Sequence, residues 1–163
     1  MRVRDGGTGA QAVTVRDAAG VDPETLVCIQ QEASVAALGH IFPPRRHPFP
    51  RADVLDHWRT FAGSFLVAER DGGAIGFAAV AGCWLVALYV LPGEWGSGVA
   101  ARLHDDALAA IRRDGCREAH LWVLEQNDRA RRFYERRGWQ RDGTERVVPY
   151  APKPIEVGYS RRL

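Results

Sequence analysis

The chain carries two distinct patterns of apolar residues, and the changes from one to the other predict the order of its helices and strands. Residues 97–113 place apolar side chains at Val99, Leu103 and Ala107, the spacing of an amphipathic helix. Compact apolar runs bounded by glycine or polar turns are typical of strands. The pattern predicts strands at 12–16, 64–70, 74–82, 84–91, 119–124, 138–148 and 155–163, and helices at 23–38, 53–62, 97–113 and 128–137. The order βααβββαβαββ indicates an α/β domain with a mixed sheet.

Residues typical of helix ends support several of these boundaries. Asp22 is a suitable N-cap, and Pro23 fits the first position of the helix that follows. Asn127 is a second N-cap, and Gly138 is a suitable C-terminal stop for the same helix. Residues 39–51 contain four prolines, so we expect a long loop there rather than regular structure.

Length and composition indicate one globular domain: the chain has 163 residues, of which 46% are hydrophobic and 26% charged. We expect residues 12–163 to form this domain and residues 1–11 to be disordered. No apolar run approaches the roughly 20 residues needed to span a bilayer. The N-terminus also lacks an apolar signal segment. The sequence therefore predicts a cytoplasmic protein without a membrane partner.

Charge and cysteine content argue against two further classes of protein. The 22 basic and 20 acidic residues give a net charge of +2, too balanced for a nucleic-acid-binding protein. Cys28, Cys83 and Cys116 lack the spacing of metal ligands, and their odd number argues against a disulfide framework. We therefore expect reduced thiols and no metal site.

A glycine-rich turn at 93–98 separates a strand from a helix. Glycine costs backbone entropy, so three glycines in six residues suggest that a ligand approaches bare backbone. A strand, a glycine-rich turn and a helix N-terminus together suit a phosphate group. Two kinds of phosphate-bearing ligand fit this description.

The first candidate is a dinucleotide. Gly96, Gly98 and Ala101 match the Gly-x-Gly-x-x-Ala pattern, and Glu125 ends the next strand, where a ribose-binding acid is expected. The position in the chain argues against this alternative. A dinucleotide fold opens with this unit, whereas here three strands precede it in quick succession.

The second candidate rests on motifs on both sides of the turn. Val90, Pro92, Gly98 and Ala100 fit a Val-x-Pro strand end followed by Gln/Arg-x-x-Gly-x-Gly/Ala, with Trp95 standing where Gln or Arg is usual. A second signature, Asn-x-x-Ala-x-x-Phe-Tyr-x-x-x-Gly-Trp, is complete in Asn127, Ala130, Phe133, Tyr134, Gly138 and Trp139. With these motifs the chain resembles the GNAT (GCN5-related) superfamily of acetyl-CoA-dependent N-acetyltransferases.

The resemblance implies a single-domain GNAT fold. Its central sheet is mixed but mostly antiparallel, is flanked by helices, and has a V-shaped splay between strands 4 and 5. Acetyl-CoA is the implied co-substrate, with its pyrophosphate on the backbone amides of the turn and its pantetheine along the splayed strand. The residues implied to bind it are Leu88, Tyr89, Val90, Gly96, Ser97, Gly98, Val99, Ala100, Ala101 and Asn127. Two alternatives stay open for Arg136 and Arg137: they bind the 3′-phosphate of coenzyme A, or they form a solvated face of the helix.

The reaction expected from the resemblance is direct attack of an amine on the thioester. Tyr134 occupies the position of the general acid, and a phenol can protonate a departing thiolate of similar basicity. The general base stays open among Glu32, His40, Glu69, Glu125 and a chain of water molecules. A non-catalytic acetyl-CoA-binding module is the alternative function.

The acceptor is expected to be a primary amine of a small molecule or a peptide, and a homodimer is left open. The loop at 39–51 is rich in aromatic residues and arginines, and we expect it to help form the acceptor pocket, with Trp58 in the helix after it. Alternatively, the loop packs its own aromatic side chains. The candidate residues are His40, Phe42, His47, Phe49 and Trp58, and Arg45, Arg46 and Arg51 would favour an acidic acceptor.

Overall fold

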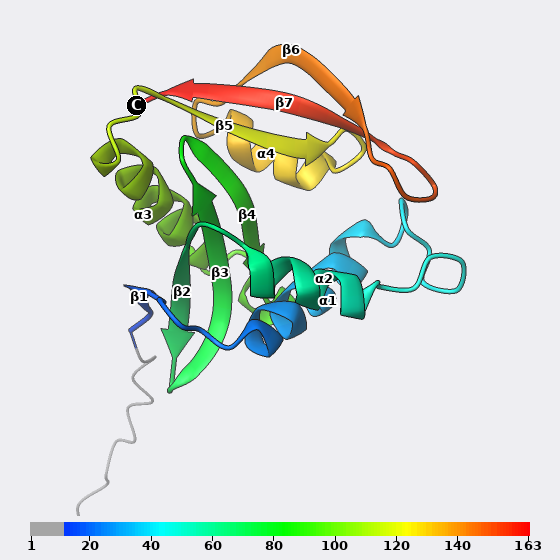
Figure 1. Ribbon diagram of the computed structural model, residues 1–163, viewed down its shortest axis with the longest axis horizontal. Coiled ribbons are helices and arrows are strands. Elements are labelled where there is room, and N and C mark those ends of the chain that lie inside the picture. The colour runs from blue at the N-terminus through cyan, green and yellow to red at the C-terminus, as the bar shows by residue number, and fades with distance from the viewer. Residues whose placement is uncertain (1–11) are drawn as a thin grey trace, which may run out of the picture.

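The computed structural model describes residues 12–163, so the expectation for residues 1–11 lies outside the described part. A seven-stranded sheet runs through the domain in the order β1-β2-β3-β4-β5-β7-β6 (Figure 1). Its strands are β1 (Thr14–Asp17), β2 (Ser64–Arg70), β3 (Gly73–Ala81), β4 (Trp84–Val90), β5 (Glu118–Leu124), β6 (Gln140–Val147) and β7 (Ile155–Arg162). The helices are α1 (Pro23–Leu38), α2 (Arg51–Thr60), α3 (Val99–Arg113) and α4 (Asp128–Glu135), with a 3-10 turn η1 at Pro92–Glu94.

The element order predicted from the sequence is confirmed, and the differences lie at the ends of elements. The helix expected at 97–113 begins at Val99, because Gly98 has a φ of 91° and so cannot continue a right-handed helix. The helix expected at 53–62 occupies Arg51–Thr60 instead, since Phe61 is already extended. Asp22 and Asn127 both act as N-caps, accepting hydrogen bonds from the backbone N–H groups of Glu24 and Ala130 respectively.

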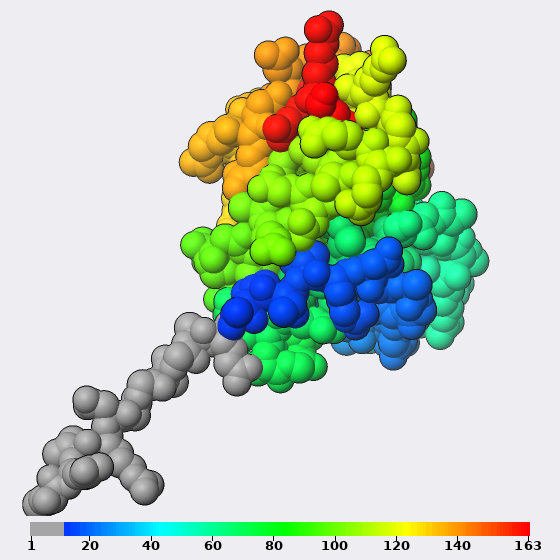
Figure 2. Space-filling view, turned by 90° about the vertical axis from the view of Figure 1, so that its left-hand side faces the viewer, coloured from blue at the N-terminus to red at the C-terminus, as the bar shows by residue number. Residues whose placement is uncertain are grey.

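Helices cover the sheet from both sides. The larger core joins α3 and α4 to one face, with Leu103, Ile111 and Tyr134 among its buried members. The smaller core joins α1 and α2 to the other face of β2, β3 and β4, around Phe77 and Trp58. Figure 2 shows the side of the molecule on which α3 lies, with the C-terminal end in red at the top. None of the helices in residues 12–163 is long and apolar enough to cross a membrane.

The parallel strands β4 and β5 form the expected V. They are in register only at Trp84 and His120, where the His120 N–H also donates to the Cys83 carbonyl at 2.9 Å. On its other side β4 pairs with β3 along its length, with a register shift that leaves Val86 as an extra residue. The strands β4 and β5 therefore separate toward their carboxyl ends, and the sheet is mixed but mostly antiparallel, as the resemblance implied.

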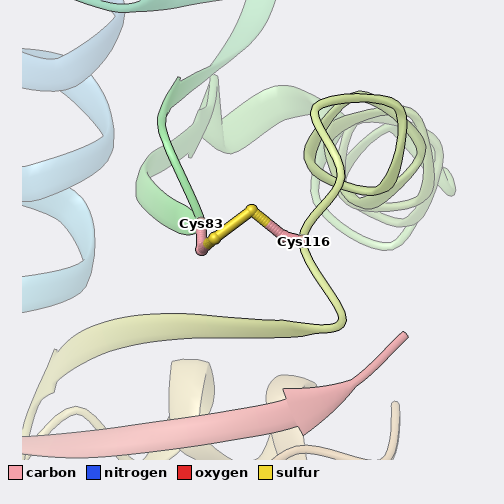
Figure 3. The surroundings of a disulfide bond; sticks show 2 residues. All are labelled: Cys83 and Cys116. Atoms are coloured by element: carbon pink, nitrogen blue, oxygen red, sulfur yellow. A yellow bond between two sulfur atoms is a disulfide. The ribbon is translucent and has the colours of Figure 1, made fainter.

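A disulfide closes the narrow end of the V, which corrects the expectation of three reduced thiols. Cys83 in the β3–β4 turn is bonded to Cys116 before β5, with their Cα atoms 5.7 Å apart (Figure 3). The parallel pairing of β4 and β5 brings these two positions together across 33 residues of sequence. A count of cysteines carries no information about such a neighbourhood, and only Cys28 remains a free, exposed thiol.

Candidate active site

The turn after β4 owes its shape to two glycines. Gly96 has a φ of 80° and Gly98 one of 91°, values that other residues rarely adopt. A Cβ atom added at either glycine would meet nothing within 4 Å. Backbone conformation, rather than lack of room in the protein, is therefore what requires glycine at these two positions, and the space beside them is open.

The first turn of α3 presents backbone N–H groups that lack partners. The amide of Arg102 donates to the Gly98 carbonyl and begins the helical ladder. The four preceding amides, at residues 98–101, have no such acceptor in the helix, and no side chain caps them in the described part of the chain. Together with the helix dipole, these amides form a site suited to an anion.

A cavity of about 160 Å³ lies beside this turn, where β4 diverges from β5. Its walls come from α1, β4, the glycine turn, the start of α3 and α4. The lining residues are Ala33, Ser34, Ala37, Leu38, Leu88, Tyr89, Val90, Trp95, Ala100, Asn127, Arg129, Ala130, Phe133 and Tyr134. Of the residues expected from sequence, Leu88, Tyr89, Val90, Ala100, Asn127 and Tyr134 are thus brought together. Gly96, Ser97, Gly98, Val99 and Ala101 do not line the cavity but form the turn and helix start next to it.

The Tyr134 phenol is held in this cavity on α4. Only 9% of the residue is exposed, and its ring packs against Phe133 and Trp139 at centroid distances of 5.3 and 5.9 Å. No group in residues 12–163 forms a hydrogen bond with its hydroxyl. Burial raises the pKa of Tyr134, with a smaller contribution from Tyr89. The phenol is therefore protonated at neutral pH and free to donate to a bound molecule.

The structure brings none of the four candidate bases to the cavity. Glu32 is exposed on α1, and Glu69 is bound to Arg16 at 2.7 Å on the far part of the sheet. His40 contacts the Gln126 carbonyl through Nε2 at 2.9 Å, while Glu125 lies 3.6 Å from Arg141.

The Tyr89 hydroxyl and the Glu156 carboxylate lie on the α1 side of the splay. The sequence predicted Tyr89 only as a cofactor-binding residue and gave no role to Glu156. The Tyr89 hydroxyl accepts a hydrogen bond from Gln30 at 3.3 Å. Glu156 on β7 points to this side, because its neighbour Val157 belongs to the opposite core. Its Oε2 accepts from Arg146 at 2.7 Å, and its side chain is 20% exposed. Burial raises the pKa of Tyr89 to about 12, and the charges of Tyr150 and Glu156 add to the shift. Tyr89 and Glu156 are 67 positions apart in the sequence, so no local pattern links them.

The α1–α2 loop contributes less to the site than expected. Trp58 is a core residue, 5% exposed, and its indole N–H donates to Gln30 at 2.7 Å; its place in the acceptor pocket was a wrong prediction. Phe49 packs against the same core. Arg51 is paired with Glu24 at 2.6 Å. Phe42 reaches outward to Tyr150 of the β6–β7 loop, with ring centroids 6.2 Å apart.

The remaining loop residues and arginines have no contact with the cavity. His47 is half-buried, while Arg45 and Arg46 are exposed in the loop. On α4, Arg136 donates to the Arg132 carbonyl at 3.1 Å, and Arg137 covers the Phe133 ring at 4.1 Å. Among the described residues, no group of three or more histidines, cysteines or acids is arranged to hold a metal ion.

Comparison with known proteins agrees with this architecture. Residues 33–139 match the model of the acetyltransferase (GNAT) family. An uncharacterized N-acetyltransferase of Mycobacterium tuberculosis is 36% identical over 86 residues, which cover 50% of this chain and 55% of the relative. The chain thus spans about half the length of the curated relatives that it matches.

Solved structures extend the likeness of fold to nearly the whole chain. A GCN5-related N-acetyltransferase from Rhodopseudomonas palustris aligns with a TM-score of 0.75 at 21% identity, over 92% of this chain and 95% of that one. The PaiA N-acetyltransferase of Thermoplasma acidophilum, solved with coenzyme A, aligns with a TM-score of 0.68 at 19% identity, over 93% and 99%. The splayed, mostly antiparallel sheet and the family match exclude a doubly wound dinucleotide-binding fold. The chain therefore belongs to the GNAT family of acetyltransferases.

Proposed function

We propose that this protein transfers an acetyl group from acetyl-CoA to a primary amine of a small molecule or peptide. One observation carries the proposal: unpartnered amides at the start of α3 and the free Tyr134 hydroxyl flank one cavity at the open end of the splay. An anion site and a proton donor on the same cavity suit a thioester that carries a pyrophosphate. The coenzyme A in the Thermoplasma structure supports the same choice of co-substrate.

In this proposal the pyrophosphate binds the turn and helix start, Gly96–Ala101, and the pantetheine arm runs along β4. The edge of β4 that faces β5 is unpaired beyond Trp84, so Leu88, Tyr89 and Val90 offer backbone groups to the pantetheine amides. Asn127 lines the same cavity and also caps α4, which leaves its amide nitrogen available for the cofactor.

The acceptor amine enters from the α1 side, toward Tyr89 and Glu156. Its ammonium group gives a proton to the Glu156 carboxylate, and the neutral nitrogen attacks the thioester carbonyl carbon. The C–S bond then breaks, and the thiolate takes the Tyr134 proton as it leaves. The tyrosinate then takes the second proton of the acylated nitrogen, which becomes the neutral amide, and the proton on Glu156 passes to water. The products are the N-acetylated acceptor and coenzyme A, with both side chains back in their starting states. Without such an acceptor the domain would be the non-catalytic binding module.

Calorimetry with acetyl-CoA tests the cofactor site. We expect the wild type to bind, and acetyl-CoA at 100 times its Kd to raise the free energy of unfolding by about 2.7 kcal/mol. Gly98→Asp should abolish binding, because it places a carboxylate where the phosphate must lie. Gly20→Asp is the matched control, since Gly20 has a φ of 78° and open space around it but lies in the turn after β1.

A folded wild type that does not bind acetyl-CoA would refute the proposal. Turnover against a panel of primary amines separates the enzyme from the non-catalytic module. Binding without turnover of any amine in the panel would favour the module.

A further inference from the structure

The cavity holds one pair of side chains that the proposed function does not use. Arg129, in the first turn of α4, lies over the Trp95 ring with its guanidinium carbon 3.6 Å from the ring centroid. Both residues line the cavity. Trp95 is itself held in place, because its indole N–H donates to the Val90 carbonyl at 3.0 Å. The guanidinium is therefore fixed on a rigid aromatic surface between the glycine turn and α4.

The described part of the chain supplies no counter-charge to Arg129. Among residues 12–163 no carboxylate forms an ion pair with it, although Asp128 next to it pairs with Arg131 at 3.6 Å. Arg129 is exposed overall, and the part of it that is buried against the cavity wall lowers the pKa of its guanidinium. An anion bound at the glycine turn would supply the missing partner.

Position 95 of the glycine turn carries no charge of its own, and the nearby cation comes from α4. The turn resembles a motif that begins with Gln or Arg, and here that position is Trp95, which carries no charge. The stacked guanidinium places a cation over the same residue from a different element. The cation beside the turn thus comes from a residue 34 positions later in the sequence.

We propose that Arg129, stacked on Trp95, binds a phosphate oxygen of the coenzyme A pyrophosphate alongside the amides of the glycine turn. This inference rests on the proposed function, since it requires a coenzyme A thioester in the cavity. Trp95 acts as a positioning residue that keeps the guanidinium flat and directed at the phosphate. Arg129 and the turn then hold the anion from two sides.

The test compares two acyl donors that differ in the pyrophosphate. Calorimetric Kd values are measured for acetyl-CoA and for S-acetylpantetheine, which lacks the pyrophosphate. Arg129→Gln should weaken acetyl-CoA binding about 10- to 100-fold, the range for loss of a charge-assisted hydrogen bond. Its affinity for S-acetylpantetheine should stay within about twofold of the wild type, because that donor makes no contact with the phosphate site. Arg132→Gln, a charge loss at an exposed position of α4 that does not line the cavity, is the matched control and should leave both Kd values unchanged.

Two further variants test the kind of cation and its position. Arg129→Lys keeps the charge but loses the planar stack, so its acetyl-CoA affinity should lie between those of the wild type and Arg129→Gln. In the double variant Trp95→Arg/Arg129→Gln, the cation returns to the turn, and acetyl-CoA affinity should recover at least in part. Thermal unfolding of each variant establishes that the fold is intact.

Three outcomes would overturn the inference. An unchanged Kd for acetyl-CoA in Arg129→Gln would show that the guanidinium does not touch the phosphate. Equal losses for both donors would make the stack a purely structural clamp. In both cases the wild type still binds acetyl-CoA, so the proposed function stands. A wild type that binds neither donor would refute the proposed function and this inference together.

Discussion

Two irregular segments of the chain are built in opposite ways, and only the first of them adjoins the cavity. The turn at 92–98 takes its shape from backbone: two glycines with positive φ and amides that the helix leaves free. The α1–α2 loop at 39–50 is placed by side chains from distant parts of the chain, since Phe42 meets Tyr150 and His40 meets the Gln126 carbonyl. The first segment can therefore be interpreted from its own residues, whereas the second acquires its role only from its partners.

The comparison also separates two kinds of aromatic residue near the acceptor side. Trp58 and Phe42 are both candidates by sequence, yet Trp58 is in the core among Phe61, Phe65 and Phe77, and Phe42 is half-buried at the loop. Composition alone does not distinguish them. The hydrogen bond from Trp58 to Gln30, which in turn bonds Tyr89, makes Trp58 a support for the site rather than a wall of it.

The largest kinetic effect is expected from loss of the Tyr134 hydroxyl, the proposed proton donor in the cavity. Tyr134→Phe keeps the ring and its packing and removes only the hydroxyl, so kcat should fall roughly 10²- to 10⁴-fold with acetyl-CoA affinity almost unchanged. The fall in kcat should be smaller for acyl donors with a more acidic thiol, because their thiolate leaves more readily without a proton. Steady-state and single-turnover rates measure the effect. Wild-type kcat in Tyr134→Phe, with chemistry limiting the rate, would show that another group supplies the proton.

The control for this substitution is Tyr159→Phe. The Tyr159 hydroxyl donates to Glu135 at 2.6 Å and accepts from Arg131 at 3.2 Å, so its loss removes hydrogen bonds to α4 outside the cavity. It should reduce stability by about 1 kcal/mol and leave kcat close to that of the wild type.

The two aromatic residues should separate stability from acceptor binding. Trp58→Ala should lower the free energy of unfolding by about 3–5 kcal/mol, as expected for a large buried side chain. Phe42→Ala should leave stability nearly unchanged but raise the acceptor KM by roughly tenfold, the equivalent of about 1.4 kcal/mol. Glu156→Gln removes the proposed base, so it should instead lower kcat by roughly 10²-fold or more. Denaturant titration and kinetics at saturating acetyl-CoA distinguish the two effects. If Phe42→Ala instead weakened acetyl-CoA and acceptor equally, the loop would not be specific to the acceptor side.

The smallest expected effect is a loss of folding stability at acidic pH, and it depends on a histidine in α3, the helix that follows the glycine turn. His104 on α3 is buried, and its Nε2 accepts from the Trp139 indole at 2.9 Å, so the ring is neutral at that nitrogen. Burial lowers the pKa of His104, opposed by the hydrogen bond to Asp105. The unfolded chain therefore binds this proton at a higher pH than the folded chain does.

It follows that the stability contributed by neutral His104 is complete above pH about 6.5 and is lost as the pH falls from there toward the lower pKa of the folded state. The loss cannot exceed about 1.4 kcal/mol per pH unit for one proton. Urea titrations between pH 5 and pH 7.5 measure it, and the slope attributable to this residue should vanish in His104→Gln. His57→Gln, at an exposed histidine, is the control and should leave this slope unchanged. If the slope were also unchanged in His104→Gln, His104 would not be the source of the pH dependence.

The sequence by itself determined whatever depends on neighbours along the chain. Interactions within a few residues set the caps at Asp22 and Asn127, the glycine turn before α3, and the succession of helices and strands along the chain. All of these were predicted. The second signature also located Tyr134 on the helix that carries it into the cavity.

Only the tertiary structure decided which distant residues meet. The Cys83–Cys116 bond depends on the parallel pairing of β4 and β5, and the burial of Trp58 depends on the packing of α2 against the sheet. The stack of Arg129 on Trp95 and the approach of Glu156 to Tyr89 likewise join separate elements. Backbone preferences are set by local sterics and hydrogen bonds, which a sequence states directly. Contacts between side chains many residues apart depend on how whole elements pack, which local patterns do not specify.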